Sequence, residues 1–231
     1  THGYDTLDHF RIDPRLGDEE DFAWLIDECS ARGIHIMLDG VFNHVARTHP
    51  WVEQRLAGDT DWEGHGELAT LHHADPAVRD AVVEIMLHWL RRGIAGWRLD
   101  VAYAVPADFW ADVLARVRSE FPDAMFLGEV IHGDYSSIGK AGSLDAVTQY
   151  ELWKATWSSL VDVNFWELAH ALERHPVDVL PNTFVGNHDV DRIASKVGPE
   201  KAVLAAAVLM TVPGMPSIYY GDEQGLSLIH I

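Results

Sequence analysis

The sequence has one cysteine, few basic residues and no long apolar run. A single cysteine excludes an internal disulfide, and Cys29 falls on the apolar side of a predicted helix, which favours a packed thiol over a nucleophile. The lone cysteine slightly favours a cytoplasmic location. No stretch is long and apolar enough to span a membrane, and residues 1–20 contain no basic segment followed by an apolar one.

Basic residues are outnumbered, because 17 Lys and Arg against 36 Asp and Glu give a formal net charge of −19. This excess of negative charge opposes binding to nucleic acid or to an anionic membrane and suits a neutral substrate. Low-complexity linkers and solenoid repeats are also missing. The 231 residues, 48% of them apolar, are enough for one large domain with a sizeable core, whereas nothing indicates the oligomeric state.

Short apolar runs alternate with segments of helical spacing along most of the chain. Helices are predicted to begin near Asp18, Pro76, Pro106, Leu152 and Pro199, and residues 138–142 are predicted to be a short connection. Polar groups follow nearly every predicted strand, which favours a (β/α) barrel over a doubly wound sheet. The six predicted strands are 34–41, 94–99, 125–128, 146–150, 183–186 and 216–223.

Four of these strands end in charged or hydrogen-bonding side chains. The sequences are DGVFNH at 39–44, GWRLD at 96–100, GEV at 128–130 and FVGNHD at 184–189. In a parallel barrel the carboxyl ends of all strands open on one face, so these side chains are expected to converge there. The sequence therefore predicts a polar site at the mouth of a barrel.

In order and type, the four segments resemble the four conserved regions of the α-amylase family of glycoside hydrolases, family 13. HGYD at 2–5 is similar to the family's loop after the second barrel strand, and YYGDE at 219–223 to its eighth strand. The resemblance extends from residue 1 to about residue 225. It implies an internal fragment of the catalytic domain, a (β/α)8 TIM barrel that is incomplete, with about six of the eight strands.

The resemblance also divides the chain. Residues 1–44 correspond to the barrel from its second loop to its third strand, and residues 76–225 run from the third helix to the eighth strand. Residues 45–75, which are irregular and rich in His, Trp, Gly and Asp, are expected to form a short loop subdomain over the active site. Residues 226–231 match nothing in the family and form a tail of unclear origin. Unpaired strand edges would make an isolated fragment poorly soluble and inactive.

The family's catalytic residues map onto three carboxylates. The resemblance implies that Asp100 is the nucleophile, Glu129 the general acid and base, and Asp189 the carboxylate that stabilises the transition state. Tyr4 would be a stacking platform beneath the sugar, and Asp39 is interpreted as a structural residue. The remaining implied substrate contacts are His44, Arg98, His188, His2, Asp5, Asn187 and Arg192.

These residue types suit retaining glycoside cleavage, which needs two carboxyl groups about 5 Å apart, one ionised and one protonated. Arg98 is two residues before Asp100 on a strand, so both side chains point to the same side, and the cation is expected to hold Asp100 ionised. Glu129 is flanked by apolar neighbours and is expected to stay protonated through poorer solvation.

The motifs imply hydrolysis of starch-type glucans or maltooligosaccharides through a covalent glucosyl-Asp intermediate. Two features keep alternatives open. Tyr103 and Ala104 replace the Lys-His pair of many starch-cutting members, and Glu129 with His132 resembles the Glu-x-x-His of members that cut cyclodextrins and pullulan. A cyclomaltodextrinase or neopullulanase, or a glucosyl transferase or isomerase, remains open. The retained carboxylates oppose an inactive binding protein.

No cofactor is required by this chemistry. Asn43 matches a calcium-binding position of many family members, but Thr70 stands where those proteins often carry Asp, so tightly bound Ca²⁺ is not expected. The pair His72 and His73 is better explained as loop surface than as a metal site. Sugar stacking and loop packing are equally open for Trp51 and Trp62, whereas a core position is predicted for Trp24, Trp89, Trp110 and Trp153.

Overall fold

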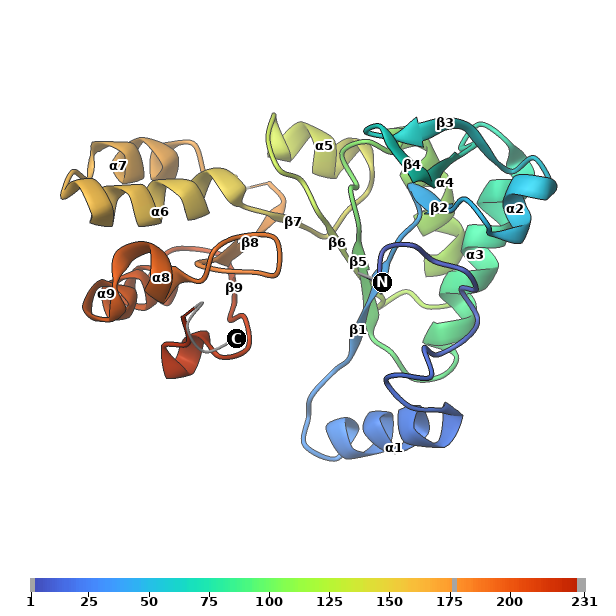
Figure 1. Ribbon diagram of the computed structural model, residues 1–231, viewed down its shortest axis with the longest axis horizontal. Helices are drawn as coiled ribbons and strands as arrows, with labels where there is room; N and C mark the ends of the chain where they lie inside the picture. The colour runs from blue at the N-terminus through green and yellow to red at the C-terminus, as the bar shows by residue number, and fades with distance from the viewer. Residues whose placement is uncertain (1–2, 176–177, 228–231) are drawn as a thin grey trace. The chain divides into compact units, whose positions relative to one another are not determined.

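Six parallel strands, three in each of two units, carry the fold of the residues that the computed structural model describes, 3–175 and 178–227 (Figure 1). Unit 1 comprises Thr1–Glu129 and Ala141–Asp145, and unit 2 comprises Val130–Lys140 and Ala146–Ile231. Each of the six strands overlaps a strand predicted from the apolar runs, although the last ends at Ser217 rather than at residue 223. Within these described ranges, no helix combines the length and the apolar character needed to cross a lipid bilayer.

Unit 1 is built on three strands in the order β1, β5, β6. They are β1 (Met37–Gly40), β5 (Gly96–Leu99) and β6 (Met125–Gly128). The parallel register places Asp39 beside Arg98, and Arg98 beside Leu127. Polar side chains of neighbouring strands are therefore level with one another near the carboxyl ends of the strands.

The helices of unit 1 are α1 (Glu19–Ser30), α3 (Pro76–Leu90) and α4 (Ala107–Arg118). The predicted apolar faces of α3 and α4 are buried, including Trp89 and Trp110. Helix α1 begins where predicted, because Asp18 forms a capping box, but none of its residues is buried and Trp24 is 64% exposed. The core prediction for Trp24 is therefore wrong, since helical spacing indicates an apolar face without indicating what covers it.

Residues 44–71 are more regular than predicted. They contain β2 (His44–Ala46), α2 (Pro50–Glu53), β3 (Ala57–Trp62) and β4 (His65–Leu71), and the strands form an antiparallel sheet in the order β2, β4, β3. Glu63 and Gly64 both have positive φ, as in the tight turns that join hairpin strands. Residues 44–71 thus contain a small sheet within unit 1, which the scattered polar and glycine residues conceal in the sequence, whereas their place over the active site stays a prediction.

Unit 2 is built on β7 (Ala146–Thr148), β8 (Leu180–Phe184) and β9 (Met215–Ser217), which are hydrogen-bonded in that order. The predicted helix from Leu152 is divided into α6 (Tyr150–Asp162) and α7 (Trp166–Glu173) by Val163, whose φ of 52° is left-handed. The predicted connection at 138–142 lies largely within a helix. The other elements are α5 (Tyr135–Ala141), α8 (Ile193–Val197), α9 (Pro199–Leu209) and the 3-10 helix η1 (Asp222–Gln224).

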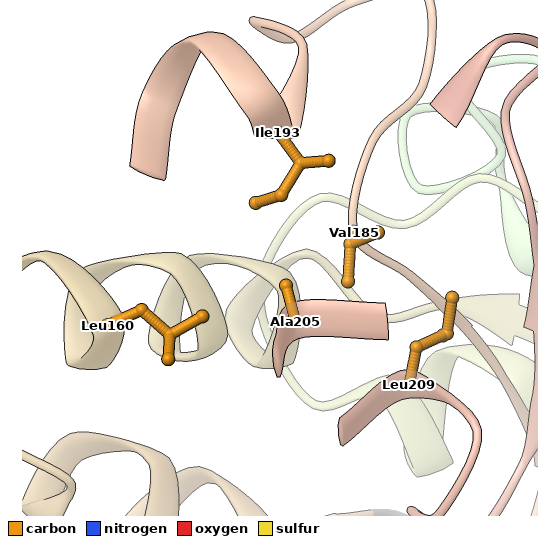
Figure 2. Close-up of a cluster of buried hydrophobic side chains, with 5 residues drawn as sticks. All are labelled: Leu160, Val185, Ile193, Ala205 and Leu209. Carbon is orange, nitrogen blue, oxygen red and sulfur yellow. The ribbon is translucent and has the colours of Figure 1, made fainter. Parts of the chain in front are cut away.

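An apolar cluster supports the loop that leaves β8 in unit 2 (Figure 2). Val185 follows β8 directly and is 6% exposed, and its partners come from three helices. This packing anchors the strand end from which the polar residues 187–189 emerge. The five residues of the cluster are Leu160, Val185, Ile193, Ala205 and Leu209.

Gly96 is required by the close approach of β5 and β6. A Cβ atom at this position would lie 2.1 Å from the carbonyl oxygen of Met125. Gly96→Ala is therefore expected to push the strands apart and to lower the free energy of unfolding by about 3 kcal/mol or more. Gly66→Ala is the control, because nothing lies within 4 Å of its added methyl group. Equal denaturation midpoints for the two variants would contradict this expectation.

Candidate active site

Two carboxylates stand at adjacent strand ends in unit 1. Asp100 follows β5 and Glu129 follows β6, and the parallel ladder continues one residue past each strand. The backbone N–H of Asp100 donates to the Gly40 carbonyl at 3.1 Å, and that of Glu129 donates to the Leu99 carbonyl at 2.9 Å. The backbone that carries each carboxylate is therefore held by the neighbouring strand.

Arg98 joins the carboxylates. Its Nη1 is 2.6 Å from Oδ1 of Asp100, and its Nη2 is 2.6 Å from Oε1 of Glu129. Nη1 also donates to both carboxylate oxygens of Asp39, at 3.0 and 3.2 Å, and Asp39 Oδ2 accepts from the Tyr4 hydroxyl at 3.0 Å. The side chains of Asp100 and Glu129 are only 7% and 6% exposed. One guanidinium thus holds three carboxylates, two of them buried.

This geometry changes the expected electrostatics. Burial raises the pKa of Asp100 to about 7, and the nearby charge of Arg98 only partly opposes this. The prediction that Arg98 holds Asp100 ionised is therefore wrong below neutral pH, because the net shift of the Asp100 pKa is upward. Arg98 contacts Glu129 as well as Asp100. The two carboxylates therefore do not have the contrasting environments that were predicted, one beside a charge and one among apolar neighbours.

The same buried environment shifts the pKa values of Arg98 and Tyr4. Burial alone would lower the pKa of Arg98, but the charges of Asp39, Glu129 and Asp100 raise it well above its usual value. Burial, followed by the charge of Asp39, raises the pKa of Tyr4. Arg98 therefore remains a cation, and Tyr4 remains a hydrogen-bond donor, throughout the physiological range.

Val101 is a contributor that sequence reasoning missed. Its backbone N–H donates to Oε2 of Glu129 at 2.9 Å. Its φ is 49°, a left-handed conformation that β-branched residues rarely adopt, and such strain is concentrated at functional sites. The strained turn after Asp100 directs a donor at Glu129, and no feature of the local sequence signals this conformation.

Thr148 was also missed. Its hydroxyl accepts from the Val130 N–H at 2.8 Å and donates to the Val130 carbonyl at 2.9 Å. Val130 directly follows Glu129 in the chain, so the clasp limits movement of the backbone next to the predicted acid and base. A threonine near the end of an apolar strand is a weak signal by itself, because β-branched residues are common in strands.

His44 and Asn43 are buried in unit 1, at 2% and 1% exposure. The Asn43 side-chain amide lies 3.2 Å from Nδ1 of His44, and the indole of Trp62 stacks on the His44 ring at 6.0 Å. Trp51 similarly stacks on His9. Trp62 therefore packs against a predicted substrate contact, whereas the contacts of Trp51 favour loop packing.

Calcium does not fit the surroundings of Asn43. Ca²⁺ takes 6–8 oxygen ligands, usually with several carboxylates. Thr70, which stands where the family resemblance places a ligating Asp, pairs with His44 in the β2–β4 register. Throughout the described part of the chain, no three His, Cys, Asp or Glu side chains gather in an arrangement that could hold a metal ion.

In unit 2, the predicted residues Asn187, His188 and Asp189 lie together after β8. The Asp189 N–H donates to Oδ1 of Asn187 at 2.9 Å, and Nε2 of His188 is 3.4 Å from Oδ2 of Asp189. The Tyr150 hydroxyl joins the group, 3.3 Å from Oδ2 of Asp189. Asp189 is 46% exposed, so its carboxylate is accessible to a ligand.

Arg192 has a different environment from the one predicted. Its side chain is 4% exposed, Nη1 donates to the Tyr220 carbonyl and to Oδ1 of Asp222, and the guanidinium lies over the Tyr219 ring at 4.3 Å. These contacts favour a structural role that ties the end of β9 to the loop after β8.

The other predicted substrate contacts are less defined. Asp5 is partly buried next to Tyr4, and His2 lies outside the described residues. The structure gathers Tyr4, Asp39, Arg98, Asp100 and Glu129 in unit 1, and Asn187, His188 and Asp189 in unit 2. That all of these residues surround one sugar stays a prediction.

Sequence comparison supports the resemblance. The family described as the alpha-amylase catalytic domain matches residues 1–65 and 62–231. A cyclomaltodextrinase of a Bacillus species is 34% identical, over 97% of this chain and 47% of that protein. An intracellular maltogenic amylase of Bacillus subtilis is 31% identical, over 98% of this chain and 44% of that protein. The chain therefore spans somewhat less than half the length of these relatives.

Solved structures extend the agreement to three dimensions. The complex of an Arthrobacter globiformis cyclic alpha-maltosyl-(1→6)-maltose hydrolase with cyclic alpha-maltosyl-(1→6)-maltose is 27% identical, with a TM-score of 0.88. The match covers 97% of this chain and 58% of that structure. The predicted fold, an incomplete (β/α)8 barrel, is confirmed.

Proposed function

Because the chain belongs to the α-amylase catalytic-domain family of glycoside hydrolases, we propose that the protein hydrolyses short linear and cyclic α-glucans with retention of anomeric configuration. The observation that carries this proposal is the pair of buried carboxylates, Asp100 and Glu129, bound to one guanidinium at 2.6 Å each. Retaining glycosidases need two carboxyl groups about 5 Å apart, and binding to one guanidinium brings Asp100 and Glu129 near one another. The net charge of −19 suits a neutral glycan.

In the first step, Asp100 attacks the anomeric carbon while Glu129 transfers its proton to the departing glycosidic oxygen. The bond to the leaving sugar breaks, and an ester forms between the glucosyl group and Asp100. In the second step, Glu129 removes a proton from water, which attacks the anomeric carbon and releases Asp100. Burial raises the pKa of Asp100 to about 7, and only the ionised form of Asp100 can attack the anomeric carbon, so the first step requires that Asp100 has lost its proton.

The protein's other groups would hold charge and geometry during these steps. Arg98 balances the carboxylates, and the N–H of Val101 fixes one oxygen of Glu129. Asp189 and His188 would bind the sugar hydroxyls, and Asp189 would stabilise the positive charge that develops on the ring. In unit 1, Tyr4 and His44 would also be substrate contacts.

Relatives support the choice of short and cyclic substrates over long starch chains. Both sequence relatives above are named for cyclomaltodextrin or maltose chemistry, and the matched structure holds a cyclic maltosyl-maltose. The departure at Tyr103 and Ala104 and the presence of His132 three residues after Glu129 point the same way. The relative described as intracellular, together with the lone Cys29, also supports a cytoplasmic location.

The test compares maltoheptaose with cyclomaltoheptaose, which contains the same number of glucose units in a ring. The native polypeptide that includes residues 1–231 is expected to cleave both and to release products that are initially α-anomers in proton NMR. Short maltooligosaccharides should dominate the products when water is the acceptor. Initial β-anomers, or no cleavage of either glucan, would contradict the proposal. Products longer than the substrate would favour a transferase instead.

A further inference from the structure

We propose that Tyr150 is a positioning residue for Asp189, holding its carboxylate in the orientation that meets the sugar. This inference rests on the proposed function, because it takes Asp189 to be a catalytic residue. Tyr150 is the first residue of α6 and lies 39 positions before Asp189 in the chain. It is not one of the predicted site residues, and only its contacts in unit 2 associate it with the site.

Three hydrogen bonds form a closed ring with a defined direction. The Asp189 N–H is a donor only, so the atom of Asn187 that it meets at 2.9 Å must be the side-chain oxygen. The Asn187 amide nitrogen then faces Tyr150, and it donates to the hydroxyl oxygen at 2.8 Å. The hydroxyl oxygen is the acceptor in that bond, and the hydroxyl donates its single proton to Oδ2 of Asp189, 3.3 Å away.

The hydroxyl is held by a rigid support. The Tyr150 ring packs edge-on against Phe184 at 4.9 Å, and Tyr150 is 9% exposed. The preceding residue, Gln149, donates its backbone N–H to the Asn182 carbonyl at 2.9 Å, which extends the β7–β8 ladder. By contrast, Asp189 is 46% exposed in a loop. The buried tyrosine therefore restricts the orientation of the exposed carboxylate.

A phenol suits this role because it is neutral. A cation at the same position would pair with Asp189 and compete with the positive charge that develops on the sugar ring, whereas a hydroxyl orients the carboxylate and leaves its charge in place. A carboxylate held through Oδ2 presents its other oxygen in a fixed direction. Small errors in such positioning are costly, and a misplacement of 1 Å can reduce the rate about 100-fold.

Tyr150→Phe in the native polypeptide that includes this chain tests the inference, because the ring packing is kept and only the hydroxyl is removed. We expect kcat on maltoheptaose to fall about 10- to 100-fold, with KM changed much less. Thr156→Val is the matched control, since it removes another buried hydroxyl from α6, one that donates to the Leu152 carbonyl at 2.8 Å. A purely structural role would give both variants similar losses of thermal stability and similar, small changes in kcat.

A double-mutant cycle with Asp189→Asn shows whether Tyr150 acts through Asp189. The loss from Tyr150→Phe should largely disappear in the Asp189→Asn background, because coupled residues are not additive. Equal losses in both backgrounds, or a Tyr150→Phe enzyme with the kcat of Thr156→Val, would overturn the inference. If Asp100→Asn and Asp189→Asn both keep parental activity, the proposed function fails instead. If Asp100→Asn and Asp189→Asn lose activity but Tyr150→Phe does not, the proposed function is supported and only the role of Tyr150 is refuted.

Discussion

Replacing Asp100 with asparagine is expected to lower kcat on maltoheptaose by on the order of 10⁴-fold or more, because an amide cannot attack the anomeric carbon. The change is nearly isosteric, and the hydrogen bond from Arg98 to Oδ1 can persist. Substrate binding should therefore change much less than kcat. Initial-rate kinetics with the native polypeptide that includes residues 1–231 measure both quantities.

Asp145→Asn is the control for this loss. Asp145 also pairs with an arginine, Arg118 at 2.8 Å, and accepts from the Phe126 N–H, but it stands before β7 and is not part of the proposed site. Its replacement should leave kcat close to the parental value. An Asp100→Asn enzyme that retains a tenth or more of parental kcat would remove Asp100 from the role of nucleophile.

The same substitution is expected to stabilise the protein at pH 8. Burial raises the pKa of Asp100 from 3.8 to about 7, so between these values the native state keeps a proton that the unfolded chain releases. The free energy of unfolding of the parent therefore falls as pH rises through this window. Relative to the parent, Asp100→Asn should gain up to about 4 kcal/mol between pH 4 and pH 8. A stability difference that does not depend on pH would contradict the burial of an ionised Asp100.

Replacing Arg98 with methionine is expected to lower the free energy of unfolding by about 3 to 5 kcal/mol at pH 8, because it leaves buried carboxylates without their cation. The methionine keeps the apolar stem, so lost packing contributes little. The loss should shrink toward pH 5, where Asp100 takes up a proton because its pKa is about 7. Denaturant unfolding at the two pH values measures the difference.

Arg91→Met provides the comparison for Arg98. Arg91 binds Glu120 through two nitrogens, each at 2.8 Å, but both side chains are exposed to solvent. Its removal should change stability little at either pH, because water solvates the carboxylate that remains. If the two variants lose equal stability, the three carboxylates around Arg98 do not depend on its charge.

The sequence was sufficient to predict the ends of β5 and β6, whereas the strands predicted to end at residues 186 and 223 end at Phe184 and Ser217. Polar residues follow the apolar runs of β1, β5 and β6, and the parallel ladder then places Asp39 beside Arg98. It also bonds Asp100 to Gly40, and Glu129 to Leu99. Residue type and order also carried the family resemblance, which the sequence comparison confirms. These features are local, or they follow from the alternation of strands and helices, so a single sequence contains them.

Other features depend on burial and on contacts across the fold. The net proton affinity of Asp100 is decided by desolvation, which the charged neighbour two residues away does not reveal. The contribution of Val101 comes from a left-handed backbone, and that of Tyr150 from a hydroxyl that reaches across 39 positions. Trp24 was predicted to lie in the core but is exposed, because helical periodicity identifies an apolar face without showing what packs against it.

The most direct test of the account is to trap the intermediate. A deoxyfluoro-glucosyl fluoride carries a good leaving group, and its second fluorine slows release of the sugar from the enzyme. Mass spectrometry of a protease digest of the native polypeptide after incubation should show one fluoroglucosyl group on the peptide that contains Asp100, and no such addition in Asp100→Asn. A label on a peptide without Asp100, or steady turnover to products of inverted configuration with no label, would contradict the central claim that Asp100 forms a covalent bond to the substrate.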